Sequence, residues 1–232
     1  MQNFLVNNSR VVNTSRVIPV GDGILDVAMS GGIRKGEVWV VGVSDSNVKH
    51  DWATQVARHI ARAGYDVALS LPEKDSKYIF ELVHSEISGV PTDRMRPGLS
   101  TKDFNQLMKT LDVTASLPIL IDDTYSKSVH ELEAKLKQAL IGRQIRCWIA
   151  DFIQPLSGNP VGRMDEIASN VNEFKKIAVS NDIGVIVFAQ SQLEGVSKEQ
   201  VLNQLAELCF VNGADLVTLL PEDSQLNVNG VN

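Results

Sequence analysis

Six short apolar runs alternate with helical segments along most of this chain, and this alternation limits the folds that the chain can adopt. Each run is apolar throughout rather than at every second position, which is typical of strands buried on both faces. The segments between the runs carry apolar residues three and four positions apart, as amphipathic helices do. The expected strands cover residues 37–43, 66–71, 117–121, 146–151, 184–189 and 214–220. We therefore predict an α/β fold of three layers with a mainly parallel central sheet.

Helical periodicity and capping residues delimit the expected helices. Ser128 and Glu131 form the capping-box pattern that opens one of them, and Gly64 ends another. The expected helices cover residues 24–29, 52–63, 74–88, 101–113, 128–140 and 164–180. Residues 191–213 are assigned to neither a helix nor a strand.

The size and composition suit one globular domain, with 232 residues of which 44% are hydrophobic and 22% charged. Residues 1–17 are polar and Asn-rich, so we expect an arm or linker there. Residues 18–221 form the expected domain, and residues 222–232 a polar tail. Cys147 and Cys209 lie in apolar runs, which predicts buried thiols rather than a disulfide or a metal pair.

Targeting and membrane signals are missing from the sequence. No apolar run reaches the roughly 18 residues that a membrane-spanning helix needs, and the N-terminus lacks the basic-then-apolar pattern of a signal peptide. We expect a cytoplasmic protein with no membrane partner.

The charge distribution bears on nucleic-acid binding. The net charge of −6 argues against tight nonspecific binding by bulk charge. Arg163 is the last arginine, and no basic residue follows Lys198. Any bound single-stranded DNA would therefore meet the earlier part of the surface or a pore shared by several subunits. We take Arg163 and Lys198 as candidate nucleic-acid contacts.

Residues 37–63 read as a strand, a short polar turn and a helix with Lys49 at its start. This is the layout of a phosphate-binding P-loop, G-x-x-x-x-G-K-[ST]. Aligned on Lys49, the pattern has Val43 and Val48 in place of both glycines and His50 in place of the hydroxyl that binds Mg²⁺. The candidate nucleotide-binding residues are Ser44, Asp45, Ser46, Asn47, Val48, Lys49 and His50. The alternative is a plain strand, turn and helix with one solvated lysine.

Polar residues follow or end several of the expected strands. In a parallel sheet such residues gather at the carboxyl edge, where ligands bind. We expect this edge to bring together Lys49, Glu73, Asp122, Asp151 and Gln190.

Several motifs, in this order, resemble the C-terminal ATPase domain of the DnaB family of hexameric replicative helicases. Residues 85–91 match the family's S-x-x-S-G-V-P and residues 120–124 its Y-I-D-D-T, while residues 149–154 are similar to V-V-D-Y-L-Q. The resemblance covers about residues 18–220 in consistent spacing. It implies a RecA-like P-loop NTPase fold, and no counterpart of the family's N-terminal domain.

The resemblance also implies roles for individual residues. Lys49 would contact phosphate, Asp151 would hold Mg²⁺ through water, and Gln190 would sense the γ-phosphate. The carboxylate that activates water lies in the family at the position of Pro72, so Glu73 would supply it only with a shift of one residue. The family's basic finger has no equivalent beyond the last strand. ATP and Mg²⁺ are the implied cofactors, and these losses count against both.

Structural explanations exist for the same residues. Lys49 could be an exposed lysine at a helix start, and Asp151 and Gln190 could merely end their strands. Asp122 and Asp123 suit the chemistry of a turn better than catalysis.

The altered parts are both loop glycines, the Mg²⁺ hydroxyl, the activating carboxylate and the basic finger. Their joint loss argues against efficient hydrolysis. We predict a DnaB-like protein of DNA replication or recombination, non-hydrolysing or weakly hydrolysing, that acts in nucleic-acid binding, assembly or regulation in a bacterial or phage-infected cell. It would form its own ring or associate with a helicase or another replisome protein. One alternative is an active ATP-dependent DNA helicase or translocase with an unorthodox P-loop, and another is a structural protein that kept only the fold.

Overall fold

The structure is a computed structural model that describes residues 5–7, 17–95, 98–126, 128–153, 160–190 and 197–220. Its centre is a seven-stranded sheet with the strand order β1-β7-β2-β6-β5-β3-β4. The six strands from β2 to β7 run parallel, and β1 pairs antiparallel with β7. The strands are β1 Leu5–Asn7, β2 Val38–Val43, β3 Asp66–Ser70, β4 Ile119–Asp122, β5 Ile145–Ile153, β6 Gly184–Gln190 and β7 Leu216–Leu219. The predicted mainly parallel sheet is confirmed.

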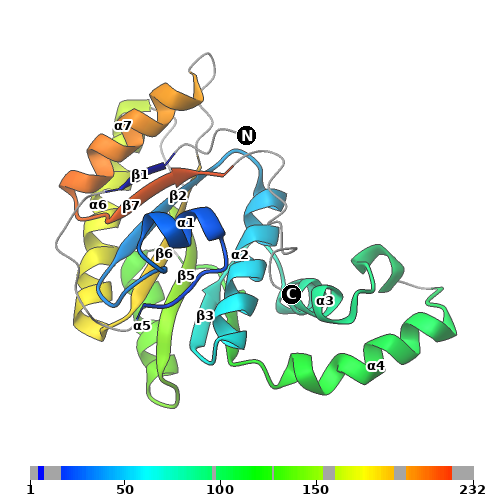
Figure 1. Cartoon of the computed structure of the whole chain (residues 1–232). Coiled ribbons are helices and arrows are strands. Elements are labelled where there is room, and N and C mark those ends of the chain that lie inside the picture. Colours follow the sequence, from blue (N-terminus) through cyan, green and yellow to red (C-terminus); the bar gives the residue numbers. More distant parts are fainter. Residues whose placement is uncertain are drawn as a thin grey trace.

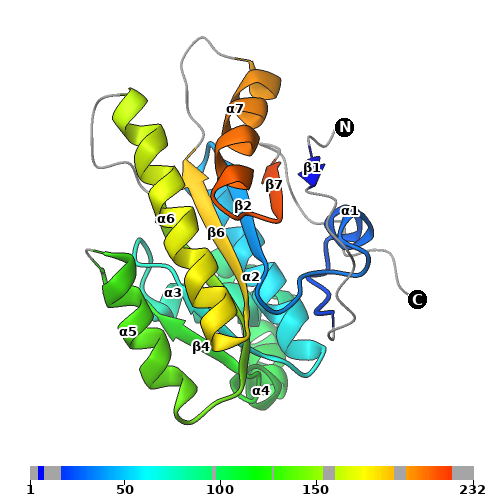
Figure 2. The same cartoon turned by 90° about the vertical axis from the view of Figure 1, so that its left-hand side faces the viewer.

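Helices cover both faces of the sheet, which gives the three predicted layers (Figure 1). Figure 2 shows α5, α6 and α7 together on one face, while α1 and α2 lie on the other. The helices are α1 Gly23–Ala28, α2 Ser46–Arg62, α3 Ser76–Ser88, α4 Thr101–Ala115, α5 Val129–Leu140, α6 Pro160–Asn181 and α7 Lys198–Val211, with a short 3₁₀ helix η1 Thr92–Met95. No helix in the described part of the chain is long and apolar enough to cross a membrane.

The strands are apolar throughout because both of their faces are buried. In β2, Trp39 and Val41 pack toward α1 and α2, whereas Val38 and Val40 pack toward α6 and α7. Successive side chains of a strand point to opposite faces, so each hydrophobic core takes every second residue. Cys147 and Cys209 are free, buried thiols, one in each core, as predicted.

The N-terminal segment contributes to the sheet. Leu5, Val6 and Asn7 form β1, which pairs with Thr218, Val217 and Leu216 of β7. The expectation of an arm over residues 1–17 did not include β1, because a three-residue strand among polar residues shows no periodicity. The described part of this arm covers one edge of the sheet.

Two helix predictions need correction. Helix α2 begins at Ser46 rather than near Trp52, because the Asp45 side chain accepts a hydrogen bond from the Asn47 amide and caps the helix. Helix α7 was not predicted, although Ser197 and Gln200 form a capping box at its start. Its buried residues are Val201, Leu202, Leu205, Ala206 and Cys209. This spacing of three and four residues was the signal that could have identified α7.

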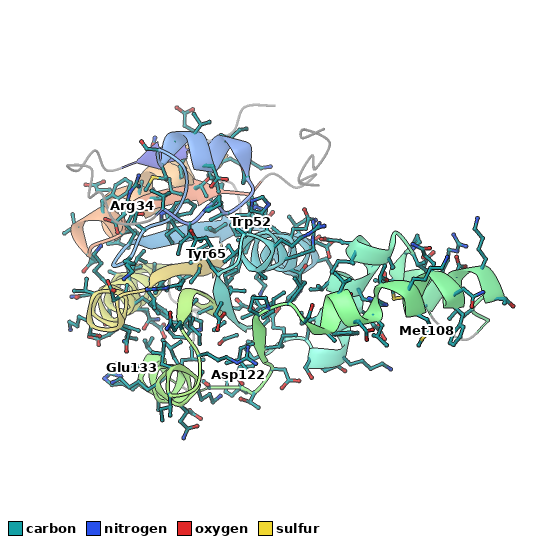
Figure 3. All side chains as sticks on the ribbon, turned by 60° about the horizontal axis from the view of Figure 1, so that its bottom comes forward. Arg34, Trp52, Tyr65, Met108, Asp122 and Glu133 are labelled. Atoms are coloured by element: carbon teal, nitrogen blue, oxygen red, sulfur yellow. The ribbon has the colours of Figure 1, made fainter. Side chains whose placement is uncertain are left out.

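Helices α3 and α4 form a hairpin that extends away from the sheet (Figure 1). The hairpin is held together by a contact of 2.6 Å between His84 Nδ1 and Thr114 Oγ1, and by the bond of 3.1 Å that Gln106 Nε2 donates to the Ser88 carbonyl. On its outer side Phe104 and Met108 are exposed, and Figure 3 shows Met108 far from the centre of the molecule.

Candidate functional site

The carboxyl ends of the parallel strands bring three of the predicted residues into contact. Lys49 lies in the first turns of α2, directly after β2, while Glu73 follows β3 and Asp151 lies in β5. Because β2, β3 and β5 run in the same direction, the segments that follow their ends meet at one edge of the sheet. The sequence analysis predicted this meeting from the strand pattern.

Lys49 is the centre of this group. Its side chain is 5% exposed, and its ammonium donates to Asp151 Oδ2 at 2.5 Å and to Glu73 Oε2 at 2.9 Å. Burial raises the pKa of Asp151 above its ordinary value, while the Lys49 charge acts in the opposite direction. The expectation of an exposed lysine at a helix start is therefore wrong.

His50 completes the group on the side of the core. Its side chain is fully buried, and its Nε2 lies 3.6 Å from Glu73 Oε2. One donor atom each from His50, Glu73 and Asp151 lies within 4.8 Å of the other two. We call Lys49, His50, Glu73 and Asp151 the Lys49 cluster. An imidazole and two carboxylates can bind a divalent metal, but the Lys49 ammonium already supplies positive charge between the carboxylates.

The loop before Lys49 does not have the shape of a phosphate cradle. Strand β2 ends at Val43 and α2 begins at Ser46, so only Ser44 and Asp45 connect them. A P-loop presents several converging backbone N–H groups in a nest that alternates right- and left-handed residues, and no residue from 44 to 50 has a positive φ. In addition, the carboxylate of Asp45 accepts from the Asn47 amide, at the place where a helix start would receive an anion.

These observations test whether ATP and Mg²⁺ fit the residues present. The helix start is capped by an acidic side chain, and the Lys49 ammonium is held by two carboxylates. A triphosphate would meet negative charge at both places. The described arrangement therefore does not fit the triphosphate and its Mg²⁺ in the way a P-loop holds them.

The remaining predicted nucleotide contacts differ in burial. Ser44 and Val48 are half-buried, with Val48 packed against the core, and Asn47 is exposed. The Ser46 side chain lies outside the described residues. Gln190 ends β6 and pairs in register with Val43 of β2, but its side chain also lies outside the described part.

The two candidate nucleic-acid contacts lie on α6 and α7. Both helices begin on the side of the sheet where the strands end (Figure 2). Lys198 is the first residue of α7 and is exposed. Arg163 lies in the first turn of α6, with a side chain outside the described residues. The two residues are therefore placed on the same edge as the Lys49 cluster.

Asp122 takes part in a turn, as the structural explanation proposed, whereas Asp123 binds the start of a distant helix. Asp122 Oδ1 accepts from the Thr124 amide at 3.1 Å, and Asp123 Oδ2 accepts from the Ser76 amide at the start of α3 at 2.7 Å. Asp122 ends β4, the outermost parallel strand next to β3, and so lies at the predicted carboxyl edge.

Sequence reasoning missed two features of this site. The first is the cap formed by Asp45, for which an acidic residue directly before a helix was the available signal. The second is the set of ion pairs within the Lys49 cluster. Such pairs depend on side-chain conformations, and no pattern along the sequence reports them.

Comparison with known proteins points to one family. A family model described as the DnaB-like helicase C-terminal domain matches residues 18–229. The chain is 27% identical to the replicative DNA helicase DnaB of Nostoc sp., over 91% of this chain and 25% of that protein. It is 23% identical to DnaB of Geobacillus stearothermophilus, over 93% of this chain and 49% of that protein. The chain thus spans a quarter to a half of the length of these two curated relatives.

Solved structures give the same fold. One of them, described as an ATPase domain, superposes with a TM-score of 0.73 at 19% identity, over 90% of this chain and 77% of that one. A DnaB-like replicative helicase, reported with its interactions with primase, superposes with a TM-score of 0.72 at 18% identity, over 91% of this chain and 53% of that one. Both likenesses establish the RecA-like fold that the motifs implied.

Proposed function

The chain belongs to the family of DnaB-like helicase C-terminal domains, and we propose that it is a non-hydrolysing or weakly hydrolysing member. In this proposal it serves DNA replication or recombination through nucleic-acid binding, assembly or regulation, and does not work as a motor of its own. It forms a ring or joins a replicative helicase or another replisome protein through surfaces of the shared fold.

One observation carries this proposal: the Lys49 ammonium is buried and bonded to Asp151 and Glu73. To contact a phosphate, Lys49 would have to leave a carboxylate that burial already disfavours in its charged form. Leaving one partner of a buried ion pair alone costs about 3–5 kcal/mol. The binding free energy of a nucleotide would have to offset that cost, and also the repulsion between its phosphates and the two carboxylates. Weak or absent triphosphate binding follows.

A second candidate function is an active ATP-dependent helicase or translocase. The convergence of Lys49, Glu73 and Asp151 favours it, since phosphoryl transfer uses a cation for the phosphate, a carboxylate for the nucleophile and a carboxylate for the metal. The family's activating carboxylate aligns with Pro72, one residue before Glu73. Glu73 nevertheless reaches Lys49, so it could take that role with a shift of one residue. In that case the ion pairs of the Lys49 cluster would rearrange when nucleotide binds.

ATP turnover separates the two functions. The rate of ATP hydrolysis with Mg²⁺ is measured with and without single-stranded DNA for the wild type, for Lys49→Met and for the control Lys109→Met. Lys109 is an exposed lysine on α4, remote in sequence from the site. We expect no turnover that depends on DNA in any of the three proteins. Hydrolysis that DNA stimulates, that Lys49→Met abolishes and that Lys109→Met leaves intact would show a working motor and contradict the proposal.

Binding measurements test the remaining part of the proposal. We expect the wild-type chain to bind single-stranded DNA or a replicative helicase, with binding that Lys49→Met leaves unchanged. Fluorescence anisotropy with a labelled oligonucleotide and sedimentation with the helicase measure these interactions. A folded chain that binds neither would be a structural protein that kept only the fold.

A further inference from the structure

A polar pocket lies where the parallel strands begin, opposite the carboxyl ends of the strands that carry the Lys49 cluster. It has a volume of about 440 Å³ and is lined by Lys35, Tyr65, Asp66, Gln144 and Arg146, among others. Ligand pockets commonly measure about 300–1,000 Å³, so this pocket can hold a small molecule. Nothing in the proposed function uses it.

The pocket is built where three parallel strands begin. Lys35 precedes β2, Asp66 is the first residue of β3, and Arg146 is the second residue of β5. The amino ends of parallel strands lie on the edge away from the carboxyl ends, so the pocket is separated from the Lys49 cluster by the length of the sheet. Figure 3 brings the lower side of Figure 1 forward and labels Tyr65 there.

Arg146 is the first sign that the pocket takes a ligand. Its side chain is half-buried, and its guanidinium makes no hydrogen bond or ion pair with any described residue. Its planar fork matches phosphate or carboxylate oxygens in pairs. Arg146 therefore offers an anion site inside the pocket.

The neighbouring charges are consistent with an anion. Lys35 lines the same pocket and pairs with Asp182, a side chain that is 67% exposed. Asp66 is the single carboxylate among the lining residues, against the two cations Lys35 and Arg146. The lining residues carry two positive charges and one negative charge, and Asp182, outside the lining, balances the charge of Lys35.

Tyr65 adds a flat apolar surface beside these cations. Its backbone is fixed, because Gly64 ends α2 with a φ of 87° and the Tyr65 amide donates to the Ile60 carbonyl at 3.2 Å. The Tyr65 side chain packs against the hydrophobic core, and an aromatic ring that lines a pocket can stack on a planar heterocycle. Asp66 can accept and Gln144 can both donate and accept hydrogen bonds, as the edge of a nucleobase requires.

We propose that this pocket binds a nucleoside monophosphate, with the phosphate on Arg146 and Lys35 and the base against Tyr65. The proposal rests only on residues at the amino ends of the parallel strands, which we call the amino edge. It does not depend on the Lys49 cluster or on any hydrolysis.

Isothermal titration of the full chain tests the proposal with AMP, GMP, dCMP and dTMP, each beside inorganic phosphate and the nucleoside without phosphate. We expect at least one monophosphate to bind. The affinity of the matching nucleoside should be lower by a factor of about ten or more, because a hydrogen bond to a charged group contributes about that factor. Absence of binding by all four monophosphates would overturn the proposal.

Variants locate the site of binding. Arg146→Gln should weaken binding of the monophosphate about tenfold or more, while Arg143→Gln, a change at an exposed arginine three positions earlier, should not. Tyr65→Leu should reduce the preference for the monophosphate over inorganic phosphate. Circular dichroism checks that each variant is folded, and Lys35→Gln serves as a second test of the anion site if Arg146→Gln fails to fold.

Two outcomes of these variants would contradict the pocket assignment. Equal affinities of the wild type and Arg146→Gln would exclude the amino edge as the binding site. If Lys49→Met abolished binding of the monophosphate, the nucleotide would bind at the carboxyl ends of the strands. That result would contradict both the pocket assignment and the proposed function. Binding that Lys49→Met leaves intact and Arg146→Gln weakens supports the pocket whichever way the ATPase experiment ends.

Discussion

Lys49 is the single residue of the P-loop pattern that this chain keeps, and two carboxylates hold its ammonium. In a P-loop the lysine reaches the outer phosphates of a nucleotide. Here the same ammonium satisfies Glu73 and Asp151, and Asp151 is buried. A motif that survives at one position therefore identifies ancestry better than it identifies activity.

The charge of Lys49 should make stability depend on pH in a predictable direction. Burial raises the pKa of Asp151 and Lys49 lowers it, so in Lys49→Met the native carboxyl holds its proton to a higher pH than in the unfolded chain. The native state then binds more protons than the unfolded state above about pH 4, and the free energy of unfolding falls as pH rises. We expect a loss of about 3–5 kcal/mol near pH 8 and a clearly smaller loss near pH 5, measured by urea denaturation. An equal loss at both pH values would contradict this explanation.

A second substitution tests the same ion pair. In the double variant Lys49→Met/Asp151→Leu, both buried charges are replaced by apolar side chains. Such replacements are often neutral or stabilising, so we expect the double variant to recover about 2 kcal/mol or more of the loss near pH 8. Lys109→Met is the control for a lysine at an exposed position. A double variant less stable than Lys49→Met would show that the cluster serves another purpose.

Individual residues could be predicted only where the topology decides their place. The strand pattern placed Lys49, Glu73 and Asp151 at one edge, because parallel strands end together. It could not give the distances between their side chains, nor the burial of the Lys49 side chain. The turn role of Asp122 could be predicted, since an Asp at a strand end commonly bonds the backbone two residues on, but the long-range bond of Asp123 to the Ser76 amide could not.

At the scale of elements, the start of α2 carries the clearest consequence. The Asp45 side chain accepts from the Asn47 amide and occupies the positive end of the helix. We expect Asp45→Ala to lower the free energy of unfolding by about 1 kcal/mol, because the first turn of the helix loses its cap. Asp45→Asn, which keeps a capping oxygen, should change it by only a few tenths of that amount. Urea denaturation midpoints measure both, and equal midpoints for the two variants would contradict the capping role.

Helices and strands with a regular apolar pattern could be predicted, and those without one could not. The strands β2 to β7 and the helices α3, α4, α5 and α6 have continuous or periodic apolar residues, so their existence was predicted. The first turns of α2 were missed because they are polar, and β1 because three residues are too few to show a period. Helix α7 was not predicted, although the sequence carries its capping box and its apolar residues three and four positions apart.

At the scale of the whole molecule, the family resemblance identified the fold through the order of its motifs. What the sequence could not give is the order of the strands in space, with β2 between β6 and β7 and with β1 outside β7. Strand order depends on long-range pairing, and each pairing joins segments that are far apart along the chain.

The pairing of β1 with β7 leads to a prediction about the whole sheet. Removal of residues 2–7 deletes β1 and leaves the hydrogen-bonding groups of β7 open at the edge. We expect a loss of roughly 1–2 kcal/mol in unfolding free energy, corresponding to a few backbone hydrogen bonds, together with association that increases with concentration, as open edge strands promote. Urea denaturation and sedimentation at two concentrations measure the two effects.

The point variant Val6→Pro, which places a residue that disfavours strands in β1 without shortening the chain, should show a weaker form of both effects. A truncated chain with an unchanged midpoint and no association would show that β1 contributes nothing to the edge.

The place of β2 in the middle of the sheet also determines when the domain can be completed during translation. A ribosome releases β2 long before β6 and β7, which are its two neighbours in the sheet. Until they emerge, the nascent chain holds an apolar strand whose partners do not yet exist, with only nearby helices to shield it. The sheet therefore cannot be completed before β7, the last of its strands in the sequence, has emerged from the ribosome.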